Sequence, residues 1–509
     1  MESIVILDFG SQYTQLISRR IRELGVYSQI MPFNASIKQI RDLNARGVIL
    51  SGSPYSVYQK GAPKPDKSLF SLDVPILGIC YGMQYITHSM GGVVQRSKQR
   101  EYGRAEIELS CDSPLFKDMD KDAKHTVWMS HSDRIEKMPA DFELIASSAN
   151  SPVAGFQHKT KPVFGLQFHP EVSHTVEGMQ ILGNFISCCS ISQKWDLGAF
   201  VDAAVSGIKN SVGRDYVIGA ISGGVDSTVA SVLTQRAIGD RLKLVFIDNG
   251  LLRYGEPEEV MSAFKAMGLK VKHVDASSLF ISRLKGVADP ERKRKIIGKT
   301  FIDVFEEHAH GKGIQWLLQG TLYPDVIESM SHLGPSQTIK SHHNVGGLPS
   351  RMRLKVLEPL RLLFKDEVRS IGRLLGIPDG ILQRQPFPGP GLSIRILGEV
   401  KQQHVDMLKM ADRIVREEID KSSLSTTLWQ YFAVLLPVKT VGIMGDERTY
   451  EYVIAVRVVN SRDAMTADWA RLPYELMDRL SSRIISEVVG VNRVVYDISS
   501  KPPSTIEWE

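Results

Sequence analysis

Cys80 lies where an apolar stretch changes into a helix-like stretch, in PILGICYGMQ (residues 75–84). A sulfur at the N-terminus of a helix is close to the positive end of the helix dipole, which favours the thiolate over the thiol. The backbone N–H of Tyr81 would face an oxyanion formed beside that sulfur, and Gly82 leaves room for a substrate. This pattern predicts a nucleophilic cysteine suited to the cleavage of an amide.

A base for this cysteine is available in FGLQFHPEV (residues 164–172), which contains His169 and Glu171. On an extended segment, residues two apart face the same side, so the carboxylate can orient the imidazole and stabilise its charged form. The loop LSGSPYS offers backbone amides around Gly52 to complete an oxyanion hole. Taken singly, such a cysteine is more often a packed core residue and such a histidine an ordinary loop residue. Only the three segments together favour catalysis.

A second chemical motif is AISGGVDSTVA (residues 220–230), between a strand-like and a helix-like stretch. Successive backbone amides at a helix N-terminus form a binding site for an anion such as phosphate. The predicted phosphate contacts are Ser222, Gly223, Gly224, Val225, Asp226, Ser227 and Thr228. The spacing GxxxxGK[ST] is absent, so the chemistry should differ from that of P-loop enzymes. The alternatives are an ordinary strand-to-helix connection and a helix N-cap role for Asp226.

Composition restricts the class of protein. With 509 residues, the chain should form roughly three domains. Hydrophobic residues make up 43% and charged residues 23%, and no run approaches the ~18 apolar residues of a membrane helix. The net charge of +5 is mild and the basic cluster at residues 291–299 is short, so neither nucleic acid nor membrane is an expected partner.

The cysteines and the first residues indicate where the protein works. Four cysteines without paired CxxC spacing predict neither a disulfide framework nor a structural zinc site. The opening MESIVILDFGSQY has no basic region before its apolar stretch, so it is expected to be a strand instead of an export signal. We expect a cytoplasmic enzyme.

Alternating strand-like and helix-like stretches must position both motifs. They occupy residues 1–190 and 195–384, separated by a predicted linker at residues 190–195. A proline and glycine cluster, QPFPGPGL (residues 385–392), marks the start of a last segment, residues 385–509. The predicted class is α/β, with two doubly wound, mostly parallel-sheet domains followed by a smaller α+β domain.

The Cys80 elbow, the HPE segment and the SGS loop together resemble the class I glutamine amidotransferase family over roughly the first 190 residues. The resemblance implies that glutamine is hydrolysed through a γ-glutamyl thioester on Cys80, with Gly52 and Tyr81 at the oxyanion. It also implies that Gln84 and the SHSD stretch (residues 130–133) lie near bound glutamine. The chain departs from the family at Ser132, where glycine is common.

The SGGVDS motif resembles that of the ATP pyrophosphatase family, whose members adenylate an oxygen and release pyrophosphate. This resemblance implies that Ile247 contacts the adenine and that Lys365, in FKDEVR, reaches the pyrophosphate. Magnesium should accompany ATP, because it prefers phosphate oxygens with few protein carboxylates, and Asp226 is the candidate carboxylate.

Four further stretches, residues 319–329, 339–349, 385–392 and the terminal KPPSTIEWE, resemble the GMP synthetase family across the whole chain. Its reaction converts XMP to GMP in de novo guanine nucleotide synthesis through an adenyl-XMP intermediate, consuming ATP and glutamine and releasing AMP, pyrophosphate and glutamate. The resemblance implies a homodimer formed through the last domain, with a departure at Glu447. The implied XMP contacts are Arg294, Lys501, Thr505, Ile506 and Glu507.

Two alternatives remain open on the sequence. One is an enzyme with the same two modules that adenylates a different acceptor. The other is a non-catalytic glutamine- or nucleotide-sensing scaffold. The intact Cys80 and SGGVDS residues favour catalysis over the scaffold, and the terminal motif favours XMP over another acceptor.

Overall fold

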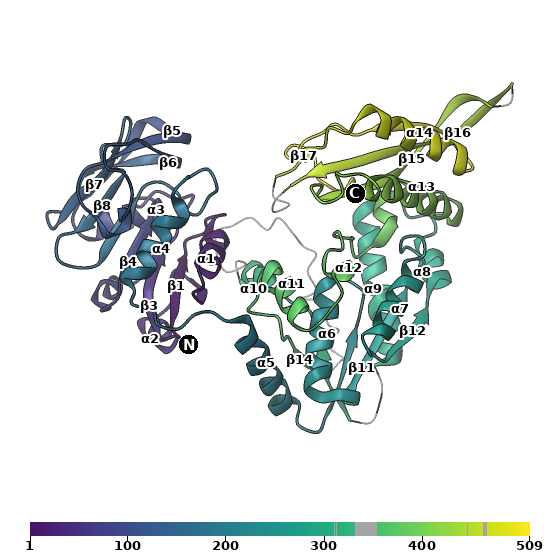
Figure 1. Ribbon diagram of the computed structural model, residues 1–509, viewed down its shortest axis with the longest axis horizontal. Coiled ribbons are helices and arrows are strands. Elements are labelled where there is room, and N and C mark those ends of the chain that lie inside the picture. The colour runs from purple at the N-terminus through teal and green to yellow at the C-terminus, as the bar shows by residue number, and fades with distance from the viewer. Residues whose placement is uncertain (310, 312, 331–353, 445, 462–465) are drawn as a thin grey trace. The chain divides into compact units, whose positions relative to one another are not determined.

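The computed structural model describes residues 1–309, 311, 313–330, 354–444, 446–461 and 466–509 (Figure 1). The stretch at 339–349, named above for its resemblance, lies outside the described residues. The described residues divide into two compact units, residues 1–197 with 324–330 and residues 198–323 with 354–509. Among the described helices, none combines the length and the apolar character needed to cross a bilayer.

The first unit is built on a nine-stranded sheet in the order β2-β1-β3-β4-β9-β8-β7-β5-β6. Its strands are β1 (Ser3–Asp8), β2 (Ser28–Pro32), β3 (Ala45–Leu50), β4 (Ile76–Ile79), β5 (Val93–Leu109), β6 (His125–Lys137), β7 (Phe142–Ser148), β8 (Gly155–His158) and β9 (Val163–Leu166). Strands β2, β1, β3, β4 and β9 pair in parallel, and the remaining strands pair antiparallel. Its helices are α1 (Thr14–Glu23), α2 (Ile37–Asp42), α3 (Tyr81–Ser89) and α4 (Gly178–Cys188).

The parallel strands are short apolar runs, as expected for strands with both faces covered. In β1 the residues Ile4, Val5, Ile6 and Leu7 are fully buried, and all four residues of β4 are buried. Because β3, β4 and β9 are neighbours and parallel, the loops that follow them emerge at the same edge of the sheet. That edge carries the three segments predicted to cleave an amide.

The second unit begins with α5 (Leu197–Val212) and contains a five-stranded, all-parallel sheet in the order β12-β11-β10-β13-β14. The strands are β10 (Tyr216–Ala220), β11 (Leu242–Asp248), β12 (Val271–Asp275), β13 (Ile314–Leu318) and β14 (Lys355–Leu357). Its helices are α6 (Val225–Ile238), α7 (Glu256–Ala266), α8 (Ser277–Leu284), α9 (Pro290–His308), α11 (Lys365–Leu374) and α12 (Asp379–Leu382). Helix α10 (Tyr323–Met330) starts at the end of this segment, and from Pro324 on it falls in the first unit.

The chain ends in a four-stranded sheet of β15 (Gln430–Met444), β16 (Glu447–Asn460), β17 (Asp468–Trp469) and β18 (Val491–Tyr496). It is accompanied by the 3-10 helix η6 (Gly391–Arg395), α13 (Gln402–Asp420) and α14 (Tyr474–Glu487). One hydrophobic core runs from Ile218 of β10 to Val491 of β18. The α/β class with large, mostly parallel sheets is confirmed, whereas the division of the second unit near residue 385 stays a prediction.

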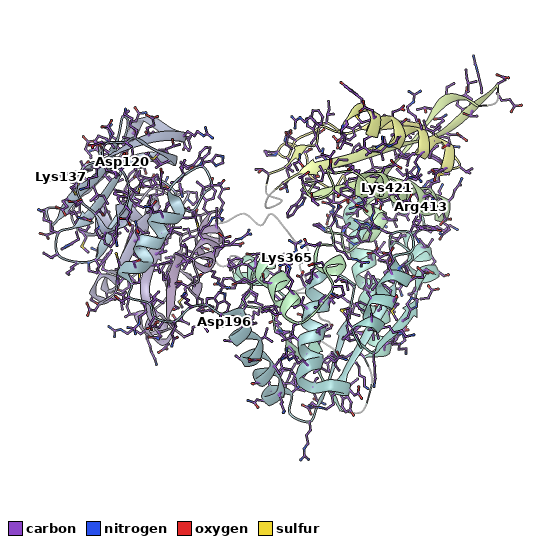
Figure 2. All side chains as sticks on the ribbon, viewed as in Figure 1. Asp120, Lys137, Asp196, Lys365, Arg413 and Lys421 are labelled. Carbon is purple, nitrogen blue, oxygen red and sulfur yellow. The ribbon has the colours of Figure 1, made fainter. Side chains whose placement is uncertain are left out.

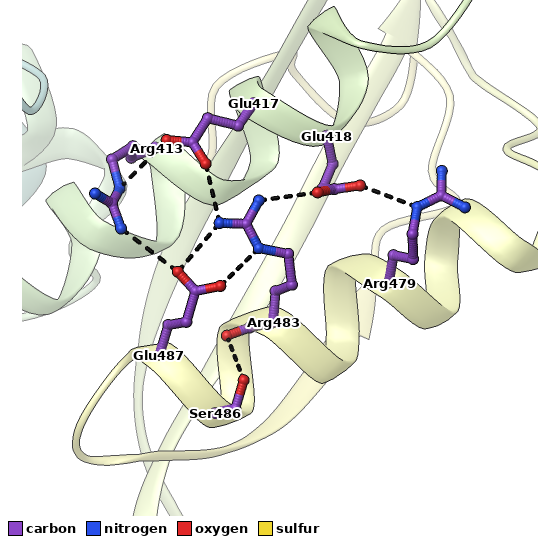
Figure 3. A network of polar contacts seen from close by, with 7 residues as sticks. All are labelled: Arg413, Glu417, Glu418, Arg479, Arg483, Ser486 and Glu487. Atoms are coloured by element: carbon purple, nitrogen blue, oxygen red, sulfur yellow. Dashed lines mark hydrogen bonds and ion pairs between the residues drawn. The ribbon is translucent and has the colours of Figure 1, made fainter.

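Charged side chains join α13 to α14 (Figure 3). Arg483 donates to Glu418 at 2.8 Å and to Glu417 at 2.9 Å, both on α13, and to Glu487 on its own helix at 2.6 Å. The hydrogen bonds with Glu487, then with Glu418 and Glu417, raise the pKa of Arg483. This network fixes the register of the two helices that pack beside the terminal sheet.

Candidate active sites

Cys80 occupies a strained turn between β4 and α3. Its backbone has φ 54° and ψ −105°, a combination that non-glycine residues rarely adopt. A Cβ at Gly78 would lie 2.6 Å from the backbone of Gly82, and a Cβ at Gly82 would lie 2.2 Å from the carbonyl oxygen of Leu50. Glycine is therefore required on both sides, because the strand, the turn and the helix meet too closely for a side chain.

His169 and Glu171 form a buried pair, as the sequence predicts. His169 Nδ1 lies 2.7 Å from Glu171 Oε1, and both residues are almost fully buried. Burial by itself lowers the pKa of His169, but the Glu171 carboxylate and the hydrogen bond with Cys80 outweigh it and hold that pKa well above its usual value. The structure thus brings Cys80, His169 and Glu171 together, and the raised pKa of His169 favours the charged imidazole beside the sulfur.

The predicted oxyanion residues lie around the same point. A Cβ at Gly52 would lie 3.4 Å from His169 Cε1, which places the Gly52 loop beside the imidazole. The Gly82 N–H donates to the Ser51 carbonyl at 3.1 Å. Tyr81 is the first residue of α3, and N–H groups in the first turn of a helix have no partner within that helix. The Tyr81 hydroxyl donates to the Pro63 carbonyl at 2.7 Å, so this residue would act through its backbone.

The region predicted to lie near glutamine is organised by Asp133. Gln84 Nε2 donates to the Asp133 carbonyl at 3.2 Å and to Gln167 Oε1 at 3.3 Å, and Gln84 is buried. Cys80 Sγ lies 3.7 Å from the Ser130 carbonyl, so the SHSD stretch borders the sulfur. Tyr58, which the sequence did not single out, donates to Asp133 Oδ1 at 2.9 Å.

The predicted phosphate loop, residues 222–228, lies where β10 leads into α6 in the second unit. Gly223 has φ 76° and Gly224 caps α6 with extended backbone. The hydroxyls of Ser222 and Ser227 lie 3.1 Å apart, and both Ser227 and Thr228 donate to the Gly224 carbonyl. This arrangement leaves the loop open at a helix N-terminus, as expected for an anion site.

Lys365 and Asp226 meet across the loop. Lys365, the first residue of α11 and labelled in Figure 2, places Nζ 2.6 Å from both carboxylate oxygens of Asp226. Ile247 lies in β11, the strand next to β10, and is buried. In the described part of the chain, no three His, Cys, Asp or Glu side chains gather to hold a metal ion.

The terminal motif is anchored at several points. Glu507 accepts two hydrogen bonds, of 3.0 and 2.8 Å, from the fully buried guanidinium of Arg395 in η6. Ile506 is buried in a small core with Phe432 and Val434. Thr505 and Lys501 are also engaged, because the Thr505 carbonyl accepts from Arg457 at 3.1 Å and the Lys501 backbone pairs with Ala467. The terminal segment therefore has a defined conformation instead of a frayed end.

The basic cluster around Arg294 forms the first turns of α9. Asp289 caps this helix by accepting from the Arg292 N–H. Arg294 Nη2 donates to the carbonyl oxygen of Glu509 at 2.5 Å, and the buried Lys293 Nζ lies 2.5 Å from Glu509 Oε2. Arg294 and the terminal motif are thus adjacent, as the shared XMP prediction requires. Lys293 was missed because a basic residue in a run of charged residues gives no sign of burial, and Arg395, between Ile394 and Ile396, because an arginine is seldom fully buried.

The comparisons with known proteins cover both ends and the full length of the chain. Residues 5–188 match the family model described as glutamine amidotransferase class-I, and residues 417–508 match the model of the GMP synthase C terminal domain. A protein from Aquifex aeolicus named GMP synthase [glutamine-hydrolyzing] is 57% identical over 508 residues, covering 99% of each chain. A protein of the same name from Chlorobium chlorochromatii is 55% identical and covers 100% of each chain. With this identity over its whole length, and with both chemical motifs intact, the chain belongs to the glutamine-hydrolysing GMP synthase family, whose members are ligases with a glutamine amidotransferase part.

Proposed function

We propose that this chain converts XMP to GMP with ammonia taken from glutamine, and that the two sites described above divide the work. The observation that carries the proposal is the buried Cys80–His169–Glu171 arrangement in a chain that resembles glutamine-hydrolysing GMP synthases over its whole length. Each residue role below is part of this proposal.

Glutamine is cleaved at Cys80. The thiolate attacks the carbon of the side-chain amide, and the backbone N–H groups near Tyr81 and Gly52 stabilise the oxyanion. His169 gives its proton to the departing nitrogen as the C–N bond breaks, so that ammonia leaves and a thioester remains. Water, deprotonated by His169, then hydrolyses the thioester to glutamate, and Glu171 keeps the imidazole oriented throughout.

The acceptor is activated at the phosphate loop. An exocyclic carbonyl oxygen of the XMP base attacks the α-phosphorus of ATP, and the bond between that phosphorus and pyrophosphate breaks. The loop of residues 222–228 and Lys365 hold the departing pyrophosphate. The product is adenyl-XMP, in which that oxygen is bonded to AMP and has become a good leaving group. Ammonia adds to the ring carbon, and AMP leaves with the oxygen to give GMP. Ile247, in the strand beside the loop, is assigned to the adenine.

Magnesium fits this site as an ion with a single protein carboxylate, that of Asp226. Asp226 is a single, partly exposed carboxylate at the start of α6, and a magnesium ion held mainly by substrate phosphates needs no more than one such ligand. When bound with ATP, the ion would neutralise charge on the phosphates. Asp226 would hold the ion, and Lys365 would contact the phosphates as a cation.

XMP is assigned to the terminal motif. Lys501, Thr505, Ile506 and Glu507 are held in place by Arg457, Ala467 and Arg395, and Arg294 lies against Glu509. A preorganised segment loses little conformational entropy when it binds a nucleotide, which supports this assignment. The segment lies in the second unit, as does the phosphate loop.

The proposal also includes a homodimer, a cytoplasmic location and three domains with the boundaries given above. Support for the homodimer comes from the β15–β16 hairpin, whose outer half exposes apolar side chains, including Ile443 at 75%. The other exposed apolar residues there are Val438, Val441 and Tyr450. Such a patch is typical of an interface.

The four unpaired cysteines support a reducing compartment.

The decisive experiment incubates the purified protein with XMP, ATP, Mg²⁺ and glutamine and separates the nucleotides. We expect GMP, AMP and pyrophosphate in equal amounts, with glutamate formed from glutamine. Production of ADP and phosphate instead of AMP and pyrophosphate would contradict adenylation, and absence of GMP would contradict the acceptor.

A further inference from the structure

Arg384 contacts the phosphate loop from a distant part of the chain. It follows α12, and its Nη1 donates to the carbonyl oxygen of Gly223 at 3.4 Å. A Cβ added at Gly223 would lie 3.2 Å from the same nitrogen, so the guanidinium packs closely against this residue. Neither the family resemblance nor the spacing of motifs assigns Arg384 a role.

The contacted peptide group is the one that must keep its orientation. The carbonyl of Gly223 and the N–H of Gly224 belong to one planar trans peptide, so they point in opposite directions. The Gly224 N–H donates to the Ser222 hydroxyl at 3.3 Å, on the side of the loop where Ser222 and Ser227 meet. A flip of this peptide would turn the carbonyl oxygen, instead of the N–H, toward an anion. Arg384 opposes that flip because it holds the carbonyl on the other side.

Arg384 is itself held by α7. Its guanidinium lies 3.4 Å from Glu259 Oε2 and 3.7 Å from Glu256 Oε1. Glu256 is buried, and its other oxygen accepts from the Arg253 N–H at 3.0 Å. Val260, also on α7, would lie 2.7 Å from a Cβ at Gly223. Helix α7 therefore supports Gly223 directly through Val260 and indirectly through Arg384.

We propose that Arg384 is a positioning residue of the ATP site, which fixes the Gly223–Gly224 peptide so that the loop N–H groups face the phosphates. The planar fork of arginine can reach the carbonyl and two carboxylates at once, whereas the single ammonium of lysine cannot hold all three in fixed directions. The inference rests on the proposed assignment of ATP to this loop.

The test compares Arg384→Gln, Arg384→Lys and the wild-type protein with ammonium salts as nitrogen donor, so that glutamine cleavage does not enter. Loss of a charge-assisted hydrogen bond predicts a KM for ATP about tenfold higher in Arg384→Gln. The KM for XMP should stay within about twofold, because the terminal motif is untouched. Arg384→Lys should give an intermediate KM for ATP. Direct titration with Mg–ATP should show the same order of affinities.

Arg373→Gln is the matched control, since Arg373 is an exposed arginine of α11 that pairs only loosely with Asp379 at 3.5 Å. A KM for ATP in Arg384→Gln that equals that of the control would overturn the inference. If Arg384→Gln does not fold, the same comparison is made with Arg384→Lys, provided that its melting temperature equals that of the wild type. A KM for ATP in Arg384→Lys that equals that of the control would then overturn the inference. An Asp226→Asn variant distinguishes failure of the proposed function from failure of this inference. If Asp226→Asn binds ATP as the wild type does, the assignment of ATP to this loop is wrong. If Asp226→Asn weakens ATP binding but Arg384→Gln does not, only the positioning role of Arg384 is wrong.

Discussion

Lys365 and Asp226, 139 residues apart in the chain, lie in contact at 2.6 Å, where the predicted phosphate loop leads into α6. Both were predicted from sequence to serve ATP, one as a cation for the phosphates and the other as a metal ligand. Each side chain neutralises the charge of the other, so neither charge is left without a partner. Binding of Mg–ATP would exchange this pair for two new ones.

Asp226→Asn should weaken the use of ATP, because the ion loses its carboxylate and Lys365 loses the partner that orients it. We expect the KM for Mg–ATP to rise about tenfold or more in the ammonium-dependent reaction. Asp240→Asn is the control, since Asp240 pairs with Lys270 at 2.9 Å on the exposed surface. Equal KM values in the two variants would contradict the role of Asp226.

Cys80→Ala should abolish GMP formation with glutamine while leaving it intact with ammonium salts. The physical reason is that the thiol acts only on glutamine, whereas adenylation and amination take place in the second unit. Cys111→Ala, which removes a thiol that bonds only to backbone carbonyls, should leave both activities unchanged. Loss of the ammonium-dependent activity in Cys80→Ala would be incompatible with this division of labour.

Glu171→Gln should lower the pKa of His169, because burial then acts without the opposing carboxylate. In the wild type the raised pKa of His169 adds to the free energy of unfolding. This contribution is complete at a pH below the histidine pKa of the unfolded chain, and it is lost as the pH rises through the higher pKa of the folded protein. The variant should lose that contribution, and its glutaminase rate should fall on the order of 100-fold or more. The alkaline limb of its pH–rate profile should move to lower pH. An unmoved limb would show that Glu171 does not set the imidazole charge.

Glu507→Gln should destabilise the second unit, because it leaves the fully buried guanidinium of Arg395 without its bidentate partner. Removal of one partner of a buried ion pair lowers the free energy of unfolding by about 3–5 kcal/mol. Because Glu507 is partly exposed, we expect a value near the lower end of this range. Urea unfolding measures the difference. The control is Glu475→Gln at an exposed position of α14, which should change the free energy of unfolding by less than about 0.5 kcal/mol.

Gly82→Ala should disrupt the elbow that carries Cys80, since the added Cβ would lie 2.2 Å from the Leu50 carbonyl. We expect a loss of about 1–3 kcal/mol in stability together with loss of glutaminase activity. Gly207→Ala in α5, where a Cβ meets nothing within 4 Å, should instead stabilise by roughly 0.5–1 kcal/mol. A Gly82→Ala variant that keeps full glutaminase activity would show that the close packing at the turn is not required.

Prediction from sequence succeeded where the signal is local. The helix-like stretch expected after Cys80 is α3, and the strand-to-helix turn expected at residues 220–230 joins β10 to α6. It did not anticipate that β5, β6, β7 and β8 extend the first sheet with antiparallel pairs, because alternating patterns do not reveal the direction of pairing. The basic cluster at residues 291–299 lies in α9, and its Lys293 is fully buried. Its burial depends on Glu509, 216 residues away.

The amino-acid sequence by itself determined the chemistry: a cysteine on a glycine-flanked turn, a histidine and a glutamate two residues apart, and a glycine-rich anion loop before a helix. These are properties of neighbouring residues, so the backbone geometry of a few positions is enough to produce them. Only the tertiary structure decided which distant side chains meet, as with Lys365 on Asp226, Arg395 on Glu507 and Arg384 on the Gly223 carbonyl. Such contacts depend on the order and direction of the strands that bring loops to a common edge, and that order is fixed by the packing of the whole core.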